Sequence, residues 1–403
     1  MNWTQRGIAL HCANRRDLSG PKRPRYTAFM RVLVTCCWLG LLPTVLFSSA
    51  QRTLAVTTTI SVDTAAKLHQ ALKNVQPGQT IMLADGVYQG NFTATQDGTS
   101  EQPITLRGSS AAILEGESLS SGYVLHVEGA DYWVLTGFSI RNGAKGLVLD
   151  NADHNIVDHL QVYQIGQEAI HFRTCSANNT LRSSTIRDTG LVDPGFGEGV
   201  YIGSDDHLWP TYSCDADQRD KSHYNKILAN HFGPNIRAEA IDVKEGTVGG
   251  VILDNEFDAT GLSGEHYSDS WVDIKGNRYK VGRNHGSRGN KTQLKHGFEV
   301  HSKAERWGRH NIFYGNVANL NSSGYGFHIV TVNGMSNPGN IVYTDNQVVG
   351  AGSGVANIPV TSSDLARSID SDEPLPEMEE TEEPLLFTPI ATVWLPLIVC
   401  PPQ

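Results

Sequence analysis

Acidic and basic residues recur beside short apolar segments in the middle of the chain. Each segment has the form small residue, apolar, any residue, apolar, and on a β-strand the residue between the two apolar ones points to the opposite face. That position is Asp242, Asp273 and Glu299 in three successive segments, and Lys244 and Lys275 follow two of them. Carboxylates about 5 Å apart on neighbouring strands repel one another unless a cation or a lysine lies between them. The pattern therefore indicates a surface that binds a cation or carries out catalysis.

Two further glutamates, Glu198 and Glu239, stand two residues before the first apolar residue of their segments. Ca²⁺ is bound by roughly six to eight hard oxygen ligands, and several carboxylates together with water can supply them. We expect Glu198, Glu239, Asp242 and Asp273 to bind Ca²⁺.

The chemistry that this combination favours is β-elimination on a uronate. The enzyme must remove the proton at C5 and stabilise the enolate-like charge on the sugar carboxylate. A partly desolvated lysine beside a calcium ion has a lowered pKa and can act as the base. Lys244 is the first candidate for the base and Lys275 the second. The alternative interpretation is a set of ion pairs between surface strands, each of which stabilises little.

Other members of the same columns are candidates for substrate binding: Arg173, Tyr201, His301 and Glu299. Arg173 or Lys275 could hold the carboxylates of an acidic sugar, because both are cationic. Tyr201 could contact a sugar ring or donate a proton, or could simply pack against its neighbours. A zinc site is not expected, since no His/Cys pair has the local spacing of zinc ligands.

The apolar segments themselves form a degenerate repeat. They begin at Gly146, Ala169, Gly199, Ala240, Trp271, Gly297 and Gly326. A second column of asparagines, each after an apolar strand, comprises Asn230, Asn255, Asn284, Asn316 and Asn346. Asparagine tolerates left-handed turn conformations, and stacked turn asparagines can hydrogen-bond along a solenoid. These repeats predict an all-β fold, a right-handed parallel β-helix in which each coil packs on its neighbours.

Four regions follow from composition and pattern. A helix expected at 64–76 would cover the open strand edges at the start of the solenoid. We assign 1–50 to a signal-peptide region, 51–130 to the N-terminal cap and first coils, 131–357 to β-helix coils with a loop insertion at 203–224, and 358–403 to an acidic, disordered tail with an apolar C-terminus.

Several features indicate export. The apolar run 32–47 follows Arg31 and ends at small residues, as in a secretory signal, and Met30 would give it a more ordinary start. The run is too short and too proline-interrupted for a stable membrane span. Cys175 and Cys214 are the cysteines of the core and are candidates for a disulfide in an oxidising compartment. Glycosylation sequons occur at Asn91, Asn178, Asn290 and Asn321. We expect a secreted, glycosylated monomer.

The charge limits the range of partners. The chain has a net charge of −10, which argues against a nucleic-acid ligand. It would also repel an acidic polysaccharide unless local cations reversed the field. The calcium ion and the lysines proposed above would provide that reversal.

Three segments carry a resemblance to a known family: PGQTIMLADGVYQGNF, QPITLRG and AEAIDVKEGTVGGVILDNEF. They resemble the pectate-lyase-like β-helix superfamily over residues 60–355, and the first is most similar to the entry segments of alginate-lyase and chondroitinase-B-like members. The resemblance implies a three-sheeted β-helix with a glycan-binding groove and a calcium-assisted lysine or arginine base. The Asn-Thr-Asp, Gly-His-Gly and Arg-Ile-Lys motifs of polygalacturonases are absent, as is the Asp-Pro-His-Glu motif of alginate epimerases.

The function predicted from these observations is a secreted polysaccharide lyase that cleaves a uronate-containing polysaccharide by Ca²⁺-assisted β-elimination. Two alternatives remain open. One is a non-catalytic extracellular β-helix that binds glycans, and the other is an inverting glycoside hydrolase, which needs two carboxyl groups about 6.5–9.5 Å apart.

Overall fold

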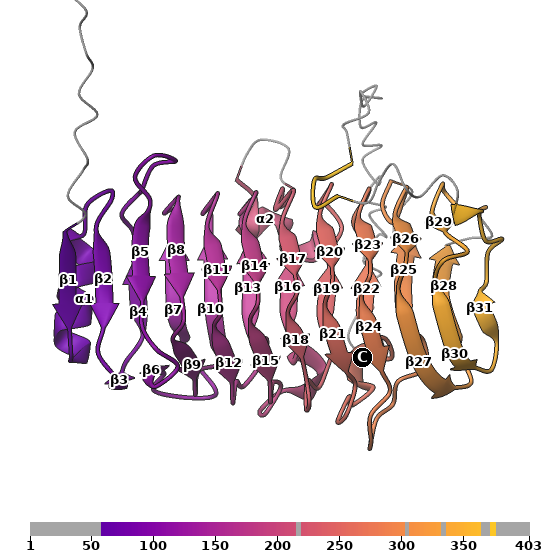
Figure 1. Cartoon of the computed structure of the whole chain (residues 1–403), viewed down its shortest axis with the longest axis horizontal. Coiled ribbons are helices and arrows are strands. Elements are labelled where there is room, and N and C mark those ends of the chain that lie inside the picture. The colour runs from indigo at the N-terminus through magenta and orange to yellow at the C-terminus, as the bar shows by residue number, and fades with distance from the viewer. Residues whose placement is uncertain (1–57, 215–218, 303–305, 332–335, 364–370, 376–403) are drawn as a thin grey trace, which may run out of the picture. The chain divides into compact units, whose positions relative to one another are not determined.

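The strands of the chain wind into three long parallel sheets, one strand of each sheet per coil (Figure 1). In this computed structural model the described residues are 58–214, 219–302, 306–331, 336–363 and 371–375. The signal-peptide region assigned to 1–50 and the apolar C-terminus lie outside them. Within the described residues, no helix is long and apolar enough to cross a membrane.

Each sheet is named here by a letter, and its strands are given in their order along the solenoid. Sheet A contains β1 (Thr59–Val62), β2 (Thr80–Leu83), β5 (Ile104–Arg107), β8 (Trp133–Thr136), β11 (Ile156–Asp158), β14 (Thr180–Arg182), β17 (Lys226–Leu228), β20 (Val251–Leu253), β23 (Lys280–Gly282), β26 (Ile312–Tyr314) and β29 (Ile341–Val342). Sheet B contains β3 (Gly86–Gln89), β6 (Ala112–Glu115), β9 (Ser139–Arg141), β12 (Gln161–Tyr163), β15 (Thr185–Arg187), β18 (His231–Phe232), β21 (Glu256–Asp258), β24 (His285–Ser287), β27 (Val317–Ser322) and β30 (Gln347–Ala351). Sheet C contains β4 (Phe92–Ala94), β7 (Tyr123–Glu128), β10 (Lys145–Asp150), β13 (Ile170–Arg173), β16 (Val200–Ile202), β19 (Ile241–Val243), β22 (Val272–Ile274), β25 (Phe298–Ser302), β28 (Tyr325–Thr331) and β31 (Gly354–Ala356).

The helices are few and short. They are α1 (Ala65–Asn74), α2 (Trp209–Tyr212) and the 3-10 turns η1 (Pro194–Phe196), η2 (Asp206–Leu208) and η3 (Glu265–Tyr267). Helix α1 is the predicted N-terminal helix. The Thr64 hydroxyl caps it by accepting the N–H of Lys67, and its apolar face packs Leu68 and Leu72 into the first coil. The helix lies at the start of the solenoid (Figure 1), where a strand edge would otherwise be open.

The predicted register of sheet C is confirmed. Leu147 pairs with Ile170, and the same column continues one coil at a time to Phe327. The side chains of this column are fully buried in the interior of the solenoid. The alternating residues, from Val148 and His171 onward, therefore share the outer face of sheet C.

The predicted asparagine ladder is also confirmed. The side-chain oxygen of Asn255 accepts the backbone N–H of Asn230 at 2.9 Å, and the Asn284 oxygen accepts that of Asn255 at 3.0 Å. The pattern continues through Asn316 to Asn346. Each asparagine side chain accepts a hydrogen bond from a main-chain N–H of the preceding coil. These N–H groups are buried, where water cannot act as the acceptor, so the ladder stabilises the turn.

A short acidic segment, residues 371–375, lies against the outer face of sheet A. The ammonium of Lys280 donates to the main-chain oxygens of Ser371 at 2.6 Å and Glu373 at 2.8 Å. Leu375 packs on an apolar patch of sheet A that includes Val251 and Tyr314. The contacts with Lys280 and the apolar patch place residues 371–375 on sheet A, and most of the tail expected to be disordered lies outside the described residues.

Candidate functional site

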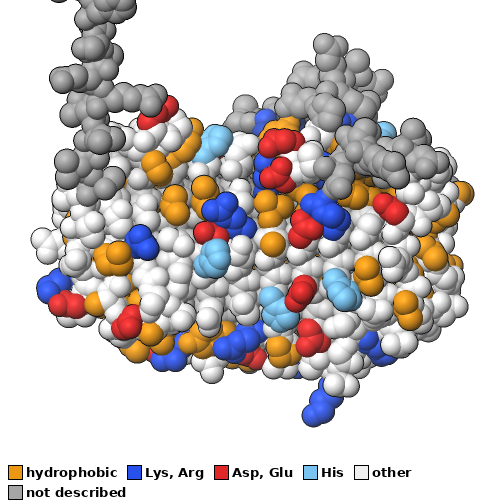
Figure 2. All heavy atoms as spheres, viewed as in Figure 1, with side chains coloured by type: hydrophobic (Ala, Val, Ile, Leu, Met, Phe, Trp, Pro, Cys, Tyr) orange, Lys and Arg blue, Asp and Glu red, His pale blue; other side chains and the backbone are white. Residues whose placement is uncertain are grey.

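The outer face of sheet C is rich in ionisable side chains. Val148, His171, Tyr201, Asp242, Asp273, Glu299 and His328 follow one another on successive strands, as the pairing of β10 to β28 shows. Figure 2 shows acidic, basic and histidine side chains together over the central coils of the face in view. The parallel register of the β-helix thus places these seven residues, which recur only weakly in the sequence, in one continuous row, here called the strip.

The centre of this strip is a pair of lysines interleaved with two aspartates. The ammonium of Lys275 lies 2.9 Å from Asp242 Oδ1 and 2.5 Å from Asp273 Oδ2. Lys244 pairs with Asp242 at 2.8 Å, and its ammonium lies 4.9 Å from the centre of the Tyr201 ring. Lys275 is therefore fixed between two carboxylates, whereas Lys244 has one carboxylate partner among the described residues and one aromatic neighbour. We call these five residues the central cluster.

The neighbouring aspartates raise the pKa of both lysines, whereas the sequence analysis expects a lowered pKa for the lysine that acts as the base. Burial alone would lower the pKa of Lys244, but the neighbouring Asp242 outweighs it and holds that pKa well above its usual range. The pKa of Lys275 is raised in the same way by Asp242 and Asp273, against the effect of burial. The neighbouring aspartates therefore favour the charged ammonium in both lysines, and the lowered pKa expected for a lysine beside a calcium ion stays a prediction.

Three buried carboxyl groups meet beside the lysines. Oxygens of Glu198, Glu239 and Asp242 lie within 4.8 Å of one another. Burial, together with the neighbouring Asp242, raises the pKa of Glu239 to about 7. Burial and nearby acids, Glu168 first among them, also raise the pKa of Glu198, and one of its side-chain oxygens is buried without a hydrogen-bond partner. Carboxyl groups in this state accommodate either a proton or a cation.

This group of carboxyls is the place in sheet C where calcium could bind. The donors are hard oxygens, and the Glu198 oxygen without a hydrogen-bond partner can accept a cation, so Glu198, Glu239 and Asp242 fit a calcium ion. Asp273 does not join them. Its two oxygens contact Lys275 and His301, which lies 2.7 Å away, so Asp273 lies outside this group of three carboxyls and its role as a fourth calcium ligand stays a prediction.

His301 and Glu299 lie at the C-terminal end of the strip. Asp273 raises the pKa of His301 despite partial burial, which favours the charged imidazolium. Burial raises the pKa of Glu299 to about 10, with Asp273 contributing, and Glu299 contacts His328 Nδ1 at 2.7 Å. His301 therefore adds positive charge to the exposed surface, whereas Glu299 is neutral and faces histidines rather than the lysines.

His296, Glu299 and His328 place three potential ligand atoms within 4.8 Å, as a transition-metal site would. The hydrogen bond to His296 argues against that use. Its Nδ1 accepts the backbone N–H of Tyr325 at 3.1 Å, so the neutral ring carries its proton on Nε2, the atom that faces Glu299. A metal at Nε2 would require the loss of that proton and leave an anionic ring, so we do not assign a metal site here.

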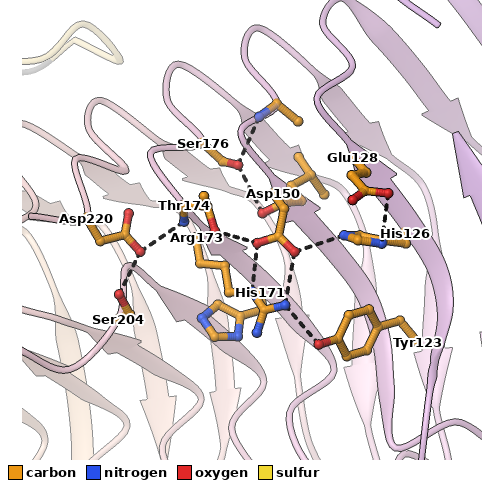
Figure 3. A network of polar contacts seen from close by, with 12 residues as sticks. Tyr123, His126, Glu128, Asp150, His171, Arg173, Thr174, Ser176, Ser204 and Asp220 are labelled. Atoms are coloured by element: carbon orange, nitrogen blue, oxygen red, sulfur yellow. Dashed lines mark hydrogen bonds and ion pairs between the residues drawn. The ribbon is translucent and has the colours of Figure 1, made fainter. Parts of the chain in front are cut away.

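Arg173 belongs to a separate network at the N-terminal side of the strip (Figure 3). Its guanidinium donates to both oxygens of Asp150 at 2.7 and 2.9 Å and to the hydroxyl of Tyr123 at 2.9 Å. His126 contacts Asp150 from the other side at 2.9 Å. Arg173, expected to bind a substrate carboxylate, is thus buried and already paired with Asp150.

The 203–224 insertion covers the far edge of this network. A disulfide joins Cys175, just after β13, to Cys214 in the insertion, and the ring of Tyr212 lies 4.3 Å from the Arg173 guanidinium. The buried carboxylate of Asp220 accepts the N–H groups of Thr174 at 3.0 Å and Cys175 at 2.8 Å. The described parts of the insertion are therefore fixed to the solenoid next to β13.

Sequence reasoning missed several of these residues. Tyr123 precedes the first recognisable repeat, and Asp220 lies within an insertion that follows no repeat. Ser268, whose hydroxyl donates to Glu239 at 3.1 Å, lies in a loop. Only the outward alternation of β7 could have indicated Tyr123.

Comparison with known proteins agrees with this geometry. Residues 49–190 match the family described as "Pel9A-like, right handed beta helix region". No curated protein matches the chain. Among solved structures, an alginate lyase from Paenibacillus sp. str. FPU-7 is 38% identical, with 76% of this chain and 99% of that chain covered and a TM-score of 0.70.

A lacto-N-biosidase from Eubacterium ramulus is 12% identical, with 76% of this chain and 67% of that chain covered and a TM-score of 0.52. This likeness shows the fold alone. The Paenibacillus enzyme, by contrast, is matched over almost its whole length at an identity that indicates common descent. The chain belongs to the family of right-handed parallel β-helix polysaccharide lyases that includes this alginate lyase.

Proposed function

We propose that the protein is a secreted polysaccharide lyase that cleaves a uronate-containing polysaccharide by β-elimination, with alginate as the first candidate substrate. The observation that supports it most is the central cluster: two charged lysines at the surface of sheet C, in a chain 38% identical to an alginate lyase. Signal-like residues 32–47 support secretion.

The balance of charges in the cluster suits the substrate when His301 is protonated. The ammonium groups of Lys244 and Lys275 balance the carboxylates of Asp242 and Asp273, burial favours the neutral forms of Glu198 and Glu239, and His301 then adds one positive charge. The net charge of the protein is negative and would repel an acidic sugar. The local charges of the strip nevertheless allow the sugar to approach. Lys275 is held rigidly by its two aspartates and is suited to orienting a uronate carboxylate.

Lys244 is placed to stabilise the charge that develops on the substrate during the reaction. In β-elimination a base takes the C5 proton, a C4–C5 double bond forms and the glycosidic oxygen at C4 departs with a proton. Among the described groups beside the lysines, the carboxyl of Glu239, whose pKa is raised to about 7, is partly ionised at neutral pH and can take the C5 proton. An ammonium beside the uronate carboxylate stabilises the charge that builds up there as the C5 proton leaves. Because its pKa is raised, we assign Lys244 to this charge stabilisation rather than to the base role expected from the sequence.

Tyr201 is placed to donate the proton. Its ring lies between His171, 4.6 Å away, and the Lys244 ammonium. Burial, with Asp242 contributing, raises the pKa of the Tyr201 hydroxyl well above its usual value, so the group keeps its proton until an oxygen of the substrate takes it. We propose that this oxygen is the leaving O4.

Calcium remains part of the proposal, with Glu198, Glu239 and Asp242 as its ligands. Bound there, the ion would supply further positive charge beside the sugar carboxylate. The residues themselves already provide two ammonium groups at the same place.

The test is an ultraviolet assay of purified protein on alginate, pectate, glucuronan and glycosaminoglycans, each with added Ca²⁺ and with EDTA. A rise in absorbance from unsaturated uronate supports the lyase, and its loss in EDTA supports calcium. Reducing ends without unsaturation would identify a hydrolase instead. Binding without any product would identify a glycan-binding solenoid.

A further inference from the structure

A pocket lies at the rim where the strands of sheet C begin, outside the central cluster. It has a volume of about 270 Å³ and is lined by Asp188, Gly190, Leu191, Pro194, Asn235 and Arg237. This volume is at the low end for ligand pockets and suits a single sugar ring better than an oligosaccharide. Arg237 stands two residues before Glu239, one of the buried carboxyls.

Arg237 is a cation without a counter-charge. Within the described ranges its guanidinium takes part in no ion pair and no side-chain hydrogen bond. The acid that lines the same pocket, Asp188, is already paired with Arg187 and accepts a hydrogen bond from Asn235 at 2.8 Å. The Arg237 guanidinium is therefore available to an anion from solution, and an arginine can bind a carboxylate through two parallel hydrogen bonds.

The stem of Arg237 is held in place by two glycines. A Cβ added at Gly190 would lie 2.7 Å from the Cβ of Arg237, and one added at Gly197 would lie 3.0 Å from it. Any side chain at either position would displace the arginine. The main chain at Gly190 and Gly197 therefore packs closely against the first carbons of the Arg237 side chain.

An apolar ridge borders the pocket. Leu191, Val192 and Phe196 are each about half exposed, and Tyr267 is 93% exposed. The ring of His266 contacts that of Phe196 edge-on at 4.8 Å, and its Nδ1–H donates to the carbonyl of Gly195 at 3.0 Å. This contact joins the turns η1 and η3 into one ridge.

The backbone of the ridge is strained at Tyr267. Its φ of 68° follows a φ of 52° at His266, and both lie in the left-handed region that bulky residues rarely adopt. The next residue, Ser268, is buried and donates to Glu239, which ties the turn to the central part of sheet C. The strained turn thus holds the exposed aromatic ring of Tyr267 on the ridge.

We propose that Arg237 and the ridge of Phe196 and Tyr267 form an accessory subsite that binds an acidic pyranose of the same polysaccharide, away from the reacting sugar. Arg237 pairs with the sugar carboxylate, and the aromatic rings contact the apolar face of the pyranose ring. The inference rests on the proposed function for the identity of the polysaccharide. It adds a binding site that lies outside the central cluster.

The experiment measures retardation of the purified protein in native gels cast with alginate, which reports binding independently of cleavage. Arg237→Gln should raise the dissociation constant for polymeric alginate about tenfold, as expected for the loss of a charge-assisted pair. Arg107→Gln, the same change at an exposed arginine on β5 of sheet A, is the matched control and should leave binding unchanged.

A second variant separates binding from folding. Tyr267→Gly removes the ring but relieves the left-handed strain, so it should raise the melting temperature while it weakens alginate binding about fivefold. A structural role for Tyr267 would instead make both stability and binding fall.

The outcomes separate this inference from the proposed function. If the wild type forms unsaturated product while Arg237→Gln and Arg107→Gln bind alike, the subsite is contradicted and the lyase stands. If the wild type forms no product but Arg237→Gln alone loses binding, the lyase is contradicted and the subsite stands. Failure of the wild type to bind any of the four polysaccharides contradicts the subsite.

Discussion

The ammonium of Lys275 lies 2.9 Å from Asp242, a residue of the preceding coil, and thereby joins two turns of the solenoid at the centre of the site. The contact follows from the parallel register, which places Asp242 beside Asp273 and lets Lys275 contact both carboxylates. It makes this lysine a structural element as well as a candidate for substrate binding.

Replacement of Lys275 by methionine should therefore destabilise the protein and abolish activity. Buried Asp273 would lose its lysine partner and Asp242 one of its two, and leaving a buried carboxylate without its cation typically costs about 3–5 kcal/mol. Chemical denaturation monitored by circular dichroism measures this. The double variant Lys275→Met/Asp242→Asn should regain part of the stability without regaining activity. Full stability of the single variant would contradict the assigned ion pairs.

Lys244 has a single carboxylate partner among the described residues, so its replacement should separate activity from stability. Lys244→Met should reduce kcat on alginate by at least about a hundredfold, as for other groups that stabilise transition-state charge, and lower stability less than Lys275→Met does. The pH profile tests its role. A charged Lys244 predicts no rise in kcat between pH 7 and roughly pH 9.5. A tenfold rise per pH unit would instead restore this lysine to the role of base.

The register of sheet C and the Asn230–Asn346 ladder could be predicted because each coil repeats the same local pattern. Inward apolar residues and turn asparagines recur at related positions, so the sequence carries the alignment of neighbouring strands. The partners of Arg173 could not be predicted in this way. Tyr123 lies 50 residues earlier, before the repeat becomes recognisable, and Tyr212 comes from the insertion.

The pKa values of the lysines were beyond sequence reasoning for a different reason. The columns place Lys244 and Lys275 beside acids, but only the side-chain conformations decide which carboxylates contact them. Burial and attraction act in opposite directions on these groups. The balance depends on distances of a few ångströms.

The segment 371–375 offers a prediction about stability. Lys280 is almost fully buried and its ammonium is satisfied by oxygens of Ser371 and Glu373. Truncation after residue 363 should expose the apolar patch on sheet A and leave Lys280 without these acceptors, so the melting temperature should fall by several degrees. In the truncated protein, Lys280→Met should recover part of the loss. An unchanged melting temperature on truncation would contradict the docking of this segment.

The lowered pKa of buried His296 leads to a prediction of how the free energy of unfolding depends on pH. Burial, with the neighbouring His328 contributing, lowers its pKa to about 3, below the ordinary value of an unfolded chain. The unfolded state therefore binds one more proton between roughly pH 6.5 and pH 3. In this window the stabilisation is progressively lost on acidification, with a slope of about 1.4 kcal/mol per pH unit from this group.

His296→Asn provides the comparison, because the asparagine oxygen can still accept the Tyr325 N–H. Urea unfolding at several pH values should show a smaller dependence on pH for this variant than for the wild type. Identical slopes would contradict the assignment of a buried neutral imidazole.

The most direct measurement of the central claim is mass spectrometry of the products that wild type, Tyr201→Phe and Lys244→Met form from alginate. β-Elimination predicts wild-type oligosaccharides that are one water lighter than hydrolysis products and absorb in the ultraviolet, with both variants severely impaired. Saturated products, or full activity in both variants, would contradict the proposed lyase site on sheet C.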